Sequence, residues 1–195
     1  MQLFILIGYR GTGKTTIARK LAERLGIPAF DSDDEIERRV GKSVAEIFAQ
    51  EGESAFRDRE ESVIAEILNR STPLVLATGG GAIIREKTRA VLRYAGRVIW
   101  LTATPETILQ RITNDTASKT MRPNLTALPM QEEIVALLKQ RTPLYAETAH
   151  EVIDTDSKTA DEIVDILQRL CRETRVPCAK VNTNVRCPSP DLVES

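Results

Sequence analysis

Residues 8–15, GYRGTGKT, constrain this chain more than any other stretch, because they fit the pattern G-x-x-x-x-G-K-[ST] of a phosphate-binding loop. The apolar run Gln2–Ile7 before the loop predicts a buried strand, and residues 17–25 carry apolar side chains at helical spacing. Backbone N–H groups and the positive helix end would then surround an anion. We expect Lys14 to reach the β- and γ-phosphates of a nucleotide and Thr15 to bind Mg²⁺. The alternative is a glycine-rich turn that binds nothing.

Length and charge narrow the class of protein further. A chain of 195 residues has room for one α/β domain with a sizeable core. The net charge of −1 gives no basic excess for nucleic acid, and no run approaches the roughly 18 apolar residues of a membrane span. Cys171, Cys178 and Cys187, with His150 as the sole histidine, match neither a zinc site nor a disulfide framework. We therefore expect a cytoplasmic protein with small-molecule partners and no nucleic-acid or membrane partner.

Two carboxylates follow a short second strand at residues 29–31. Asp31 and Asp33 flank Ser32 where this strand leaves the sheet, and ligands of parallel α/β sheets bind at the carboxyl ends of strands. Side chains two residues apart in an extended segment point the same way. One carboxylate could hold Mg²⁺ through water while the other accepts a hydrogen bond from an attacking hydroxyl. Solvated acids at the start of a helix are the alternative.

A helical segment with one candidate ligand comes next. Ser43 and Glu46 form a capping box, and Gly52 interrupts the helix before a second one begins. Arg57 lies on this second helix, with Glu60 three residues on to hold its guanidinium in one orientation. Taken alone, Arg57 is more typical of a surface charge than of a ligand.

Three consecutive glycines, Gly79, Gly80 and Gly81, end the third apolar strand. Ordering three glycines costs conformational entropy, so we expect a reason for them, and we predict that a ligand contacts the backbone here. A flexible turn that binds no ligand is the alternative. A helix over residues 85–94 and a fourth strand over 97–103 follow, and we expect Trp100 to be buried. Thr104 then caps a helix that runs to about residue 112.

The stretch Thr113–Pro129 is polar and lacks a clear period, which is typical of a functional loop such as a lid. Arg122 would then reach the transferring phosphate when the lid closes, whereas a disordered surface loop is the alternative. A helix over residues 130–149 carries Arg141, and a fifth strand precedes a last helix that starts at a second capping box. From residue 172 the pattern stops, which predicts a mobile tail over residues 172–195.

Five strands alternating with helices predict an α/β fold, a three-layer sandwich with a parallel sheet. Residues 1–171 form its single domain, with a helical excursion over about 33–61 and a lid over about 113–125.

Six motifs resemble those of one family, the shikimate kinases. They are GYRGTGKT, DSD at 31–33, SVAEIF…GE…FRDRE at 43–60, TGGGAI at 78–83, MRPNL at 121–125 and RTPLY at 141–145. Each is weak alone, but six in order are specific. The resemblance implies a P-loop kinase fold with strand order 2-3-1-4-5, and a monomer that phosphorylates the 3-hydroxyl of shikimate with ATP and Mg²⁺.

The resemblance also implies a role for individual residues. Lys14, Asp33 and Arg122 would be catalytic, Asp33 by binding the accepting hydroxyl as base or orienting group. Thr15 would bind Mg²⁺, and Asp31 would assist through water. The substrate would contact Asp33, Arg57, Gly79, Gly80, Gly81 and Arg141, with the two arginines on its carboxylate. ATP would contact Gly11, Thr12, Gly13, Lys14, Thr15, Thr16, Arg111 and Arg122. Arg111 would lie against adenine, and the segment after the fifth strand, Thr155–Lys158, has no assigned contact.

Two other functions stay open on the sequence alone. Another small-molecule kinase, such as one similar to gluconate kinase, would share the fold and the phosphate-binding loop. A nucleotide-binding module that has lost catalysis would usually lack one of Lys14, Asp33 or Arg122. All three residues are present, which favours turnover without proving it.

Overall fold

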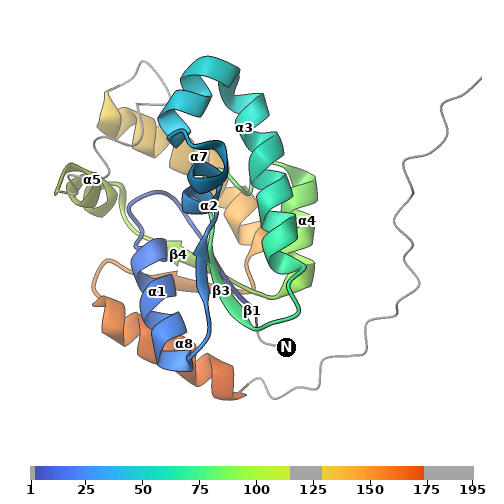
Figure 1. Ribbon diagram of the computed structural model, residues 1–195. Helices are drawn as coiled ribbons and strands as arrows, with labels where there is room; N and C mark the ends of the chain where they lie inside the picture. Colours follow the sequence, from blue (N-terminus) through green and yellow to red (C-terminus); the bar gives the residue numbers. More distant parts are fainter. Residues whose placement is uncertain (1–2, 115–128, 174–195) are drawn as a thin grey trace, which may run out of the picture.

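The structure, a computed structural model, describes residues 3–114 and 129–173 around one parallel sheet (Figure 1). The strands are β1 (Leu3–Ile7), β2 (Ala29–Asp31), β3 (Leu74–Ala77), β4 (Arg97–Thr102) and β5 (Glu151–Asp154). Their order is β2-β3-β1-β4-β5, and all four pairings are parallel. The predicted three-layer α/β sandwich and its strand order are therefore confirmed.

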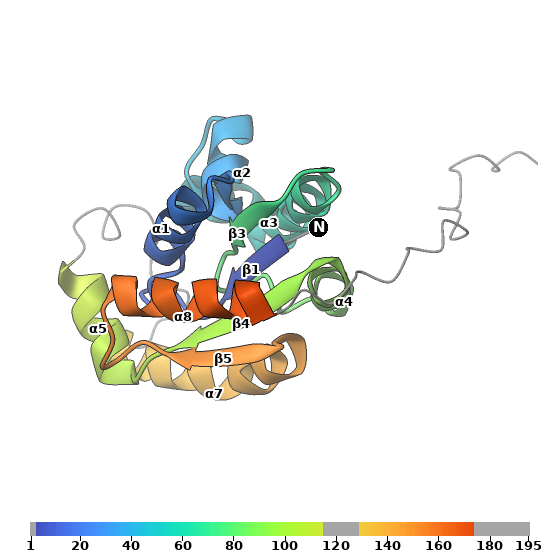
Figure 2. The same cartoon turned by 90° about the horizontal axis from the view of Figure 1, so that it is seen from below.

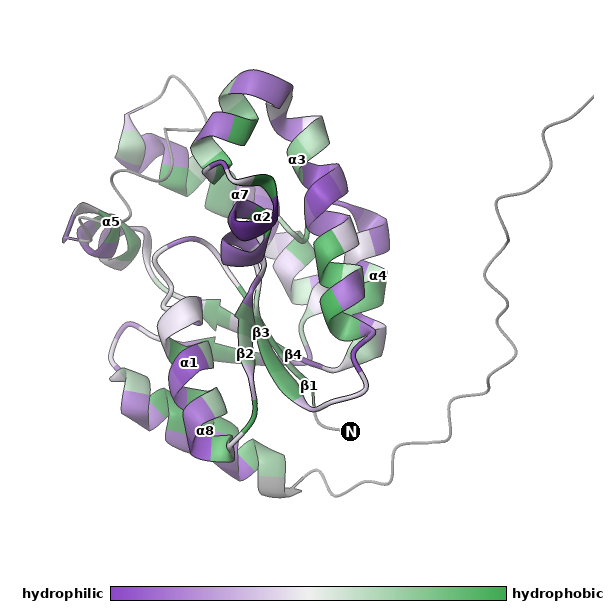
Figure 3. Ribbon diagram, in the orientation of Figure 1, coloured by the Kyte–Doolittle hydropathy of each residue, from purple (hydrophilic) through white to green (hydrophobic). Residues whose placement is uncertain are grey.

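Helices cover both faces of the sheet (Figures 1 and 2). Successive side chains of β1 point to opposite faces, so each face needs its own helical layer. Phe4 and Leu6 pack under α1 (Lys14–Leu25) and α8 (Ala160–Glu173). Leu3, Ile5 and Ile7 pack on the other face with side chains of four further helices. Those helices are α2 (Ser32–Val40), α3 (Val44–Leu68), α4 (Glu86–Ala95) and α7 (Met130–Thr148). Figure 3 shows the apolar residues concentrated on the strands and on the helix faces beside them.

The excursion between β2 and β3 consists of α2 and α3, and it differs from the prediction at its start. Ser43 and Glu46 form the predicted capping box, and Gly52 breaks α3 with φ 82° and ψ 170°. However, α2 begins at Ser32, and the Asp31 side chain caps it by accepting a hydrogen bond from the Asp33 backbone N–H. Asp33 thus lies in a helical first turn, and the expectation of two carboxylates along one extended segment was wrong.

Burial of Trp100 was also predicted wrongly. Its side chain is only partly buried, although it stacks on the Tyr145 ring with centroids 5.5 Å apart. The helix α5 (Pro105–Asn114) begins as predicted, with the Thr107 N–H donating to the Thr104 hydroxyl.

The lid residues 115–125, including Arg122, and residues 174–195 of the predicted tail lie outside the described residues, whereas residues 172 and 173 belong to the end of α8. Within residues 3–114 and 129–173, no helix is both long and apolar enough to cross a membrane.

Candidate active site

The phosphate-binding loop connects β1 to α1 in the conformation that its glycines allow. Gly8, Gly11 and Gly13 have φ values of 143°, 80° and 87°, a region that side chains other than glycine rarely adopt. A Cβ atom on Gly8 would also collide with the Leu101 carbonyl. The Lys14 ammonium folds over the loop and donates to the carbonyls of Gly8 and Tyr9, both at 2.8 Å. This loop thus has the conformation and the cation of a phosphate site.

The start of α1 meets the end of β2 through one short hydrogen bond. The Thr15 hydroxyl donates to the Asp31 carboxylate, with Oγ1 and Oδ2 2.6 Å apart. Hydroxyl and carboxylate oxygens are the donors that Mg²⁺ prefers. In the described part of the chain, no group of three or more His, Cys, Asp or Glu residues could hold a metal. The donor set therefore fits a cation bound jointly with nucleotide phosphates rather than a cage made by protein alone.

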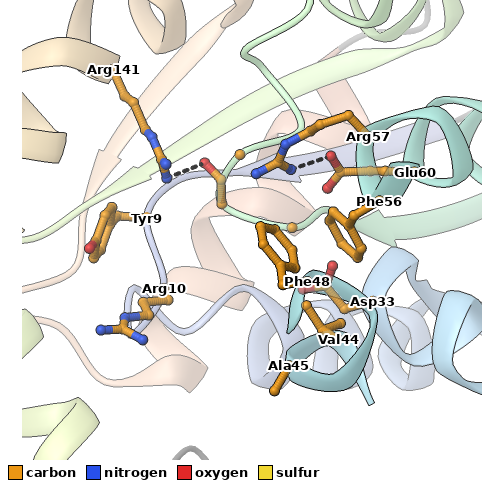
Figure 4. A pocket seen from close by; sticks show the side chains of 13 residues that line it. Tyr9, Arg10, Asp33, Val44, Ala45, Phe48, Phe56, Arg57, Glu60 and Arg141 are labelled. Carbon is orange, nitrogen blue, oxygen red and sulfur yellow. Dashed lines mark hydrogen bonds and ion pairs between the residues drawn. The ribbon is translucent and has the colours of Figure 1, made fainter. Parts of the chain in front are cut away.

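A pocket beside the phosphate-binding loop brings distant segments together (Figure 4). Tyr9 and Arg10 contribute from the loop, Asp33 from α2, and Arg141 from α7. From α3 and the turn after β3 the lining includes Phe48, Phe56, Arg57, Glu60 and Gly79–Gly81. All the predicted substrate contacts thus lie in one pocket.

Arg57 is buried in this pocket and is held by two carboxylates of its own helix. Only 8% of the residue is exposed, which excludes the surface-charge interpretation. Its guanidinium donates to Glu60 at 2.5 Å, as the spacing predicted, and to Glu53 at 3.2 Å. Burial raises the pKa of the Glu60 carboxyl, and the neighbouring Arg57 charge opposes that rise. Glu60 Oε1 makes no hydrogen bond within the described residues, so a ligand hydroxyl could donate to it.

The turn after β3, Gly79–Gly81, is called the glycine turn below, and it leaves room for charged side chains. A Cβ on Gly79 would lie 2.5 Å from Glu60 Oε1 and 2.7 Å from Asp33 Oδ1. A Cβ on Gly81 would overlap the Arg57 guanidinium. These glycines therefore do more than expose backbone. Without side chains of their own, they let Asp33, Arg57 and Glu60 approach one another across the pocket.

Arg141 approaches the same turn from the opposite side. Its guanidinium lies 3.4 Å from the Gly80 carbonyl, and the Tyr145 hydroxyl donates to that carbonyl at 2.5 Å. Burial raises the pKa of Tyr145, so its hydroxyl keeps the proton that it donates. Arg141 also lies over the Tyr9 ring, 5.9 Å from the centroid. The two pocket arginines are thus fixed independently, each by groups of its own.

Arg111 connects the phosphate-binding loop to the segment after β5. It donates to the Thr155 carbonyl at 2.7 Å, to the Thr155 hydroxyl at 2.9 Å and to the Gly11 carbonyl at 3.3 Å. Arg111 therefore lies beside the phosphate-binding loop, and Thr155, which the sequence left unassigned, orients it.

Several residues that line the pocket or contact its lining were not predicted as functional. Phe48 belongs to the SVAEIF motif but was given no role of its own, yet its ring lies 4.8 Å from that of Phe56 and 5.9 Å from the Arg57 guanidinium. Tyr9 and Arg10 occupy variable positions of the loop pattern, which carries no signal for them. Tyr145 has the spacing of a core residue, and only its hydroxyl distinguishes it.

Comparison with known proteins identifies the family. The family model described as shikimate kinase matches residues 10–172. The chain belongs to the shikimate kinase family. It is 42% identical to the shikimate kinase of Rhodopirellula baltica, over 84% of this chain and 87% of that one. It is 45% identical to the shikimate kinase of Thermobifida fusca, over 86% and 93%.

Solved shikimate kinases also share the fold. The enzyme of Acinetobacter baumannii, solved in complex with shikimate, is 39% identical with a TM-score of 0.83, covering 90% of this chain and 96% of that one. The enzyme of Aquifex aeolicus is 28% identical with a TM-score of 0.70, covering 88% and 98%.

Proposed function

We propose that this protein is a shikimate kinase that transfers the γ-phosphoryl group of ATP to the 3-hydroxyl of shikimate, in the route to chorismate and the aromatic amino acids. The single observation that carries the proposal is the pocket that joins Asp33, Arg57, the glycine turn and Arg141 to the phosphate-binding loop. A small anionic polyol requires cations for its carboxylate and an acceptor for one chosen hydroxyl, and this pocket supplies both.

On the acceptor side, Arg57 and Arg141 would bind the carboxylate of shikimate. Asp33 would accept the hydrogen bond of the 3-hydroxyl and orient its oxygen toward the γ-phosphorus. The phosphoryl-transfer transition state has weak bonds to the attacking oxygen, so orientation matters more than early removal of the proton. The hydroxyl proton would pass to Asp33 as the new P–O bond forms and the bond to ADP breaks.

On the nucleotide side, Lys14 and the backbone N–H groups of Gly11, Gly13 and Thr15 would hold the phosphates. Thr12 and Thr16 would complete this contact. Thr15 and, through water, Asp31 would hold Mg²⁺, which when bound would neutralise charge on the β- and γ-phosphate oxygens. Arg111 would lie against adenine, and Arg122, outside the described residues, would approach the transferring group.

A coupled assay of ADP release tests the proposal with shikimate, with gluconate and without an acceptor. We expect release with shikimate alone. Arg57→Ala should raise the shikimate KM about 30-fold or more, because loss of a buried charge partner costs roughly 2–5 kcal/mol. Arg59→Ala is the matched control, since Arg59 is on the same helix, outside the pocket, and pairs with Glu51.

ADP release with gluconate but not shikimate would overturn the proposed acceptor. An unchanged shikimate KM in Arg57→Ala would overturn only the proposal that Arg57 binds the carboxylate of shikimate. A cytoplasmic location and a monomeric state stay predictions from the sequence.

A further inference from the structure

One buried ion pair at the pocket has no part in the mechanism above. Arg10 is the third residue of the phosphate-binding loop, and Glu133 lies in the first turn of α7. Arg10 Nη2 and Glu133 Oε1 are 3.6 Å apart, and the two side chains are 11% and 0% exposed. Burying a carboxylate completely is costly unless nearby charge compensates it. The Arg10 guanidinium and the positive end of α7 both supply that compensation.

The direction of the Arg10 side chain separates it from the acceptor-binding groups. Arg10 lines the pocket, but in Figure 4 its guanidinium is turned away from Asp33. Its ion pair is with Glu133, on the helix that also carries Arg141. The pair therefore links the loop that would hold ATP to the helix that would hold the acceptor.

Helix α7 makes a second contact from about two turns after Glu133, this time with the glycine turn of the acceptor pocket. Arg141 and Tyr145 both reach the Gly80 carbonyl. Gly80 in turn packs on the phosphate-binding loop, since a Cβ there would lie 3.3 Å from the Arg10 backbone nitrogen. Helix α7, held at Glu133 and at Arg141, thus spans from one substrate site to the other.

We propose that Arg10 and Glu133 are a positioning pair that sets the place of α7, and with it Arg141, relative to the phosphate-binding loop. Neither residue is assigned a contact with the reacting atoms. The inference rests on the proposed function, because it concerns the alignment of the acceptor hydroxyl with the phosphoryl donor. Transfer rates are sensitive to such alignment, and a displacement of about 1 Å can cost 100-fold.

The test combines four variants with measurements of kcat, shikimate KM and the thermal midpoint. Glu133→Gln keeps the shape but removes the charge, and we expect kcat to fall about 10-fold or more with KM changed less than about threefold. The double variant Arg10→Met with Glu133→Met removes both charges, so the thermal midpoint should recover while kcat stays low. Arg10→Lys keeps a cation for Glu133 and should retain more kcat than Arg10→Met.

Glu151→Gln is the matched control, because it removes the carboxylate of the Arg97–Glu151 ion pair between β4 and β5, far from the pocket lining. Its kcat should equal that of the unaltered enzyme. A role in stability alone predicts that kcat recovers together with the thermal midpoint in the double variant, which would overturn the inference. Unchanged kcat in Glu133→Gln would also overturn it, with the proposed function intact. Failure of the unaltered protein to phosphorylate shikimate would instead overturn the proposed function and the inference that rests on it.

Discussion

The phosphate-binding loop and the acceptor pocket are built in different ways. The loop is eight consecutive residues whose backbone conformation makes the site, and Lys14 donates back to two carbonyls of the same loop. The pocket takes its charged side chains from α2, α3, α7 and the loop itself, and two of them, Asp33 and Arg141, are more than 100 residues apart in the chain. One site is local in sequence, and the other exists only after the sheet and its helices have assembled.

This difference determines what a substitution should disturb. In the pocket, Arg57 is held by the buried Glu60, and Arg10 is held by the buried Glu133. Removing one member leaves its partner buried and uncompensated. Pocket variants should therefore change acceptor binding or turnover while the nucleotide site, supported by its own backbone, keeps its affinity.

The largest effect that separates the two regions is expected from Asp33→Asn. An amide cannot take the proton of the attacking hydroxyl and orients it poorly, so kcat should fall about 10²–10⁴-fold. The ADP affinity, measured by calorimetry, should stay within about threefold. Asp34→Asn is the control, since Asp34 is half exposed and pairs with Arg19 outside the pocket. Turnover of Asp33→Asn close to that of the unaltered enzyme would remove Asp33 from the mechanism.

An intermediate effect is expected from Gly81→Ala, which tests the space that the glycine turn provides. The new methyl group would overlap the Arg57 guanidinium and displace it from the carboxylate position. The shikimate KM should rise about 30-fold, equivalent to roughly 2 kcal/mol of lost charge pairing, while the ATP KM stays unchanged.

Gly26→Ala provides a contrast for that experiment. Gly26 has φ 67° and open space around it, so the change should cost about 1 kcal/mol of stability without affecting either KM. If Gly81→Ala bound shikimate normally, the close approach of Arg57 to the turn would have no part in substrate binding.

The contrast between the two regions also explains what the sequence predicted well. Strand, loop and helix around residues 8–15 follow from local pattern, as do the capping box at Ser43 and the break at Gly52. These features depend on backbone conformation within a few residues. The strand order, by contrast, came only from resemblance to a family, since periodicity carries no information on which strands are neighbours.

The pocket was predicted less completely, because its residues look ordinary in sequence. Arg57 has the spacing of a surface ion pair, and only burial under Phe48 and Phe56 makes it a ligand candidate. Asp33 was placed on an extended segment, although Asp31 is a typical N-cap residue and its side chain caps a helix that starts at Ser32. Tertiary packing therefore decides the role of Arg57, whereas the position of Asp33 follows from a local cap that the sequence analysis gave less weight.

The smallest effect is expected outside both sites, at Glu35 of α2. The hydrogen bond from Arg38, with a further one from Arg39, lowers the pKa of this carboxyl to about 2. Arg39 also pairs with Glu66 of α3, so the cluster joins the two helices of the excursion. Glu35→Gln should cost roughly 0.5–1 kcal/mol of unfolding free energy at pH 7, the range of partly exposed ion pairs, with kcat and KM unchanged.

The pH dependence of that cost has a definite sign. Because the folded pKa lies below the ordinary value of 4.5, the Glu35 charge stabilises the fold fully above pH 4.5 and progressively less as the pH falls toward 2. The stability difference between the unaltered protein and Glu35→Gln, from urea unfolding at pH 7, 5 and 4, should therefore shrink toward acid. A difference that stayed constant or grew would show that shape rather than charge holds α2 against α3. A loss of kcat in this variant would show that catalysis depends on side chains beyond the pocket lining.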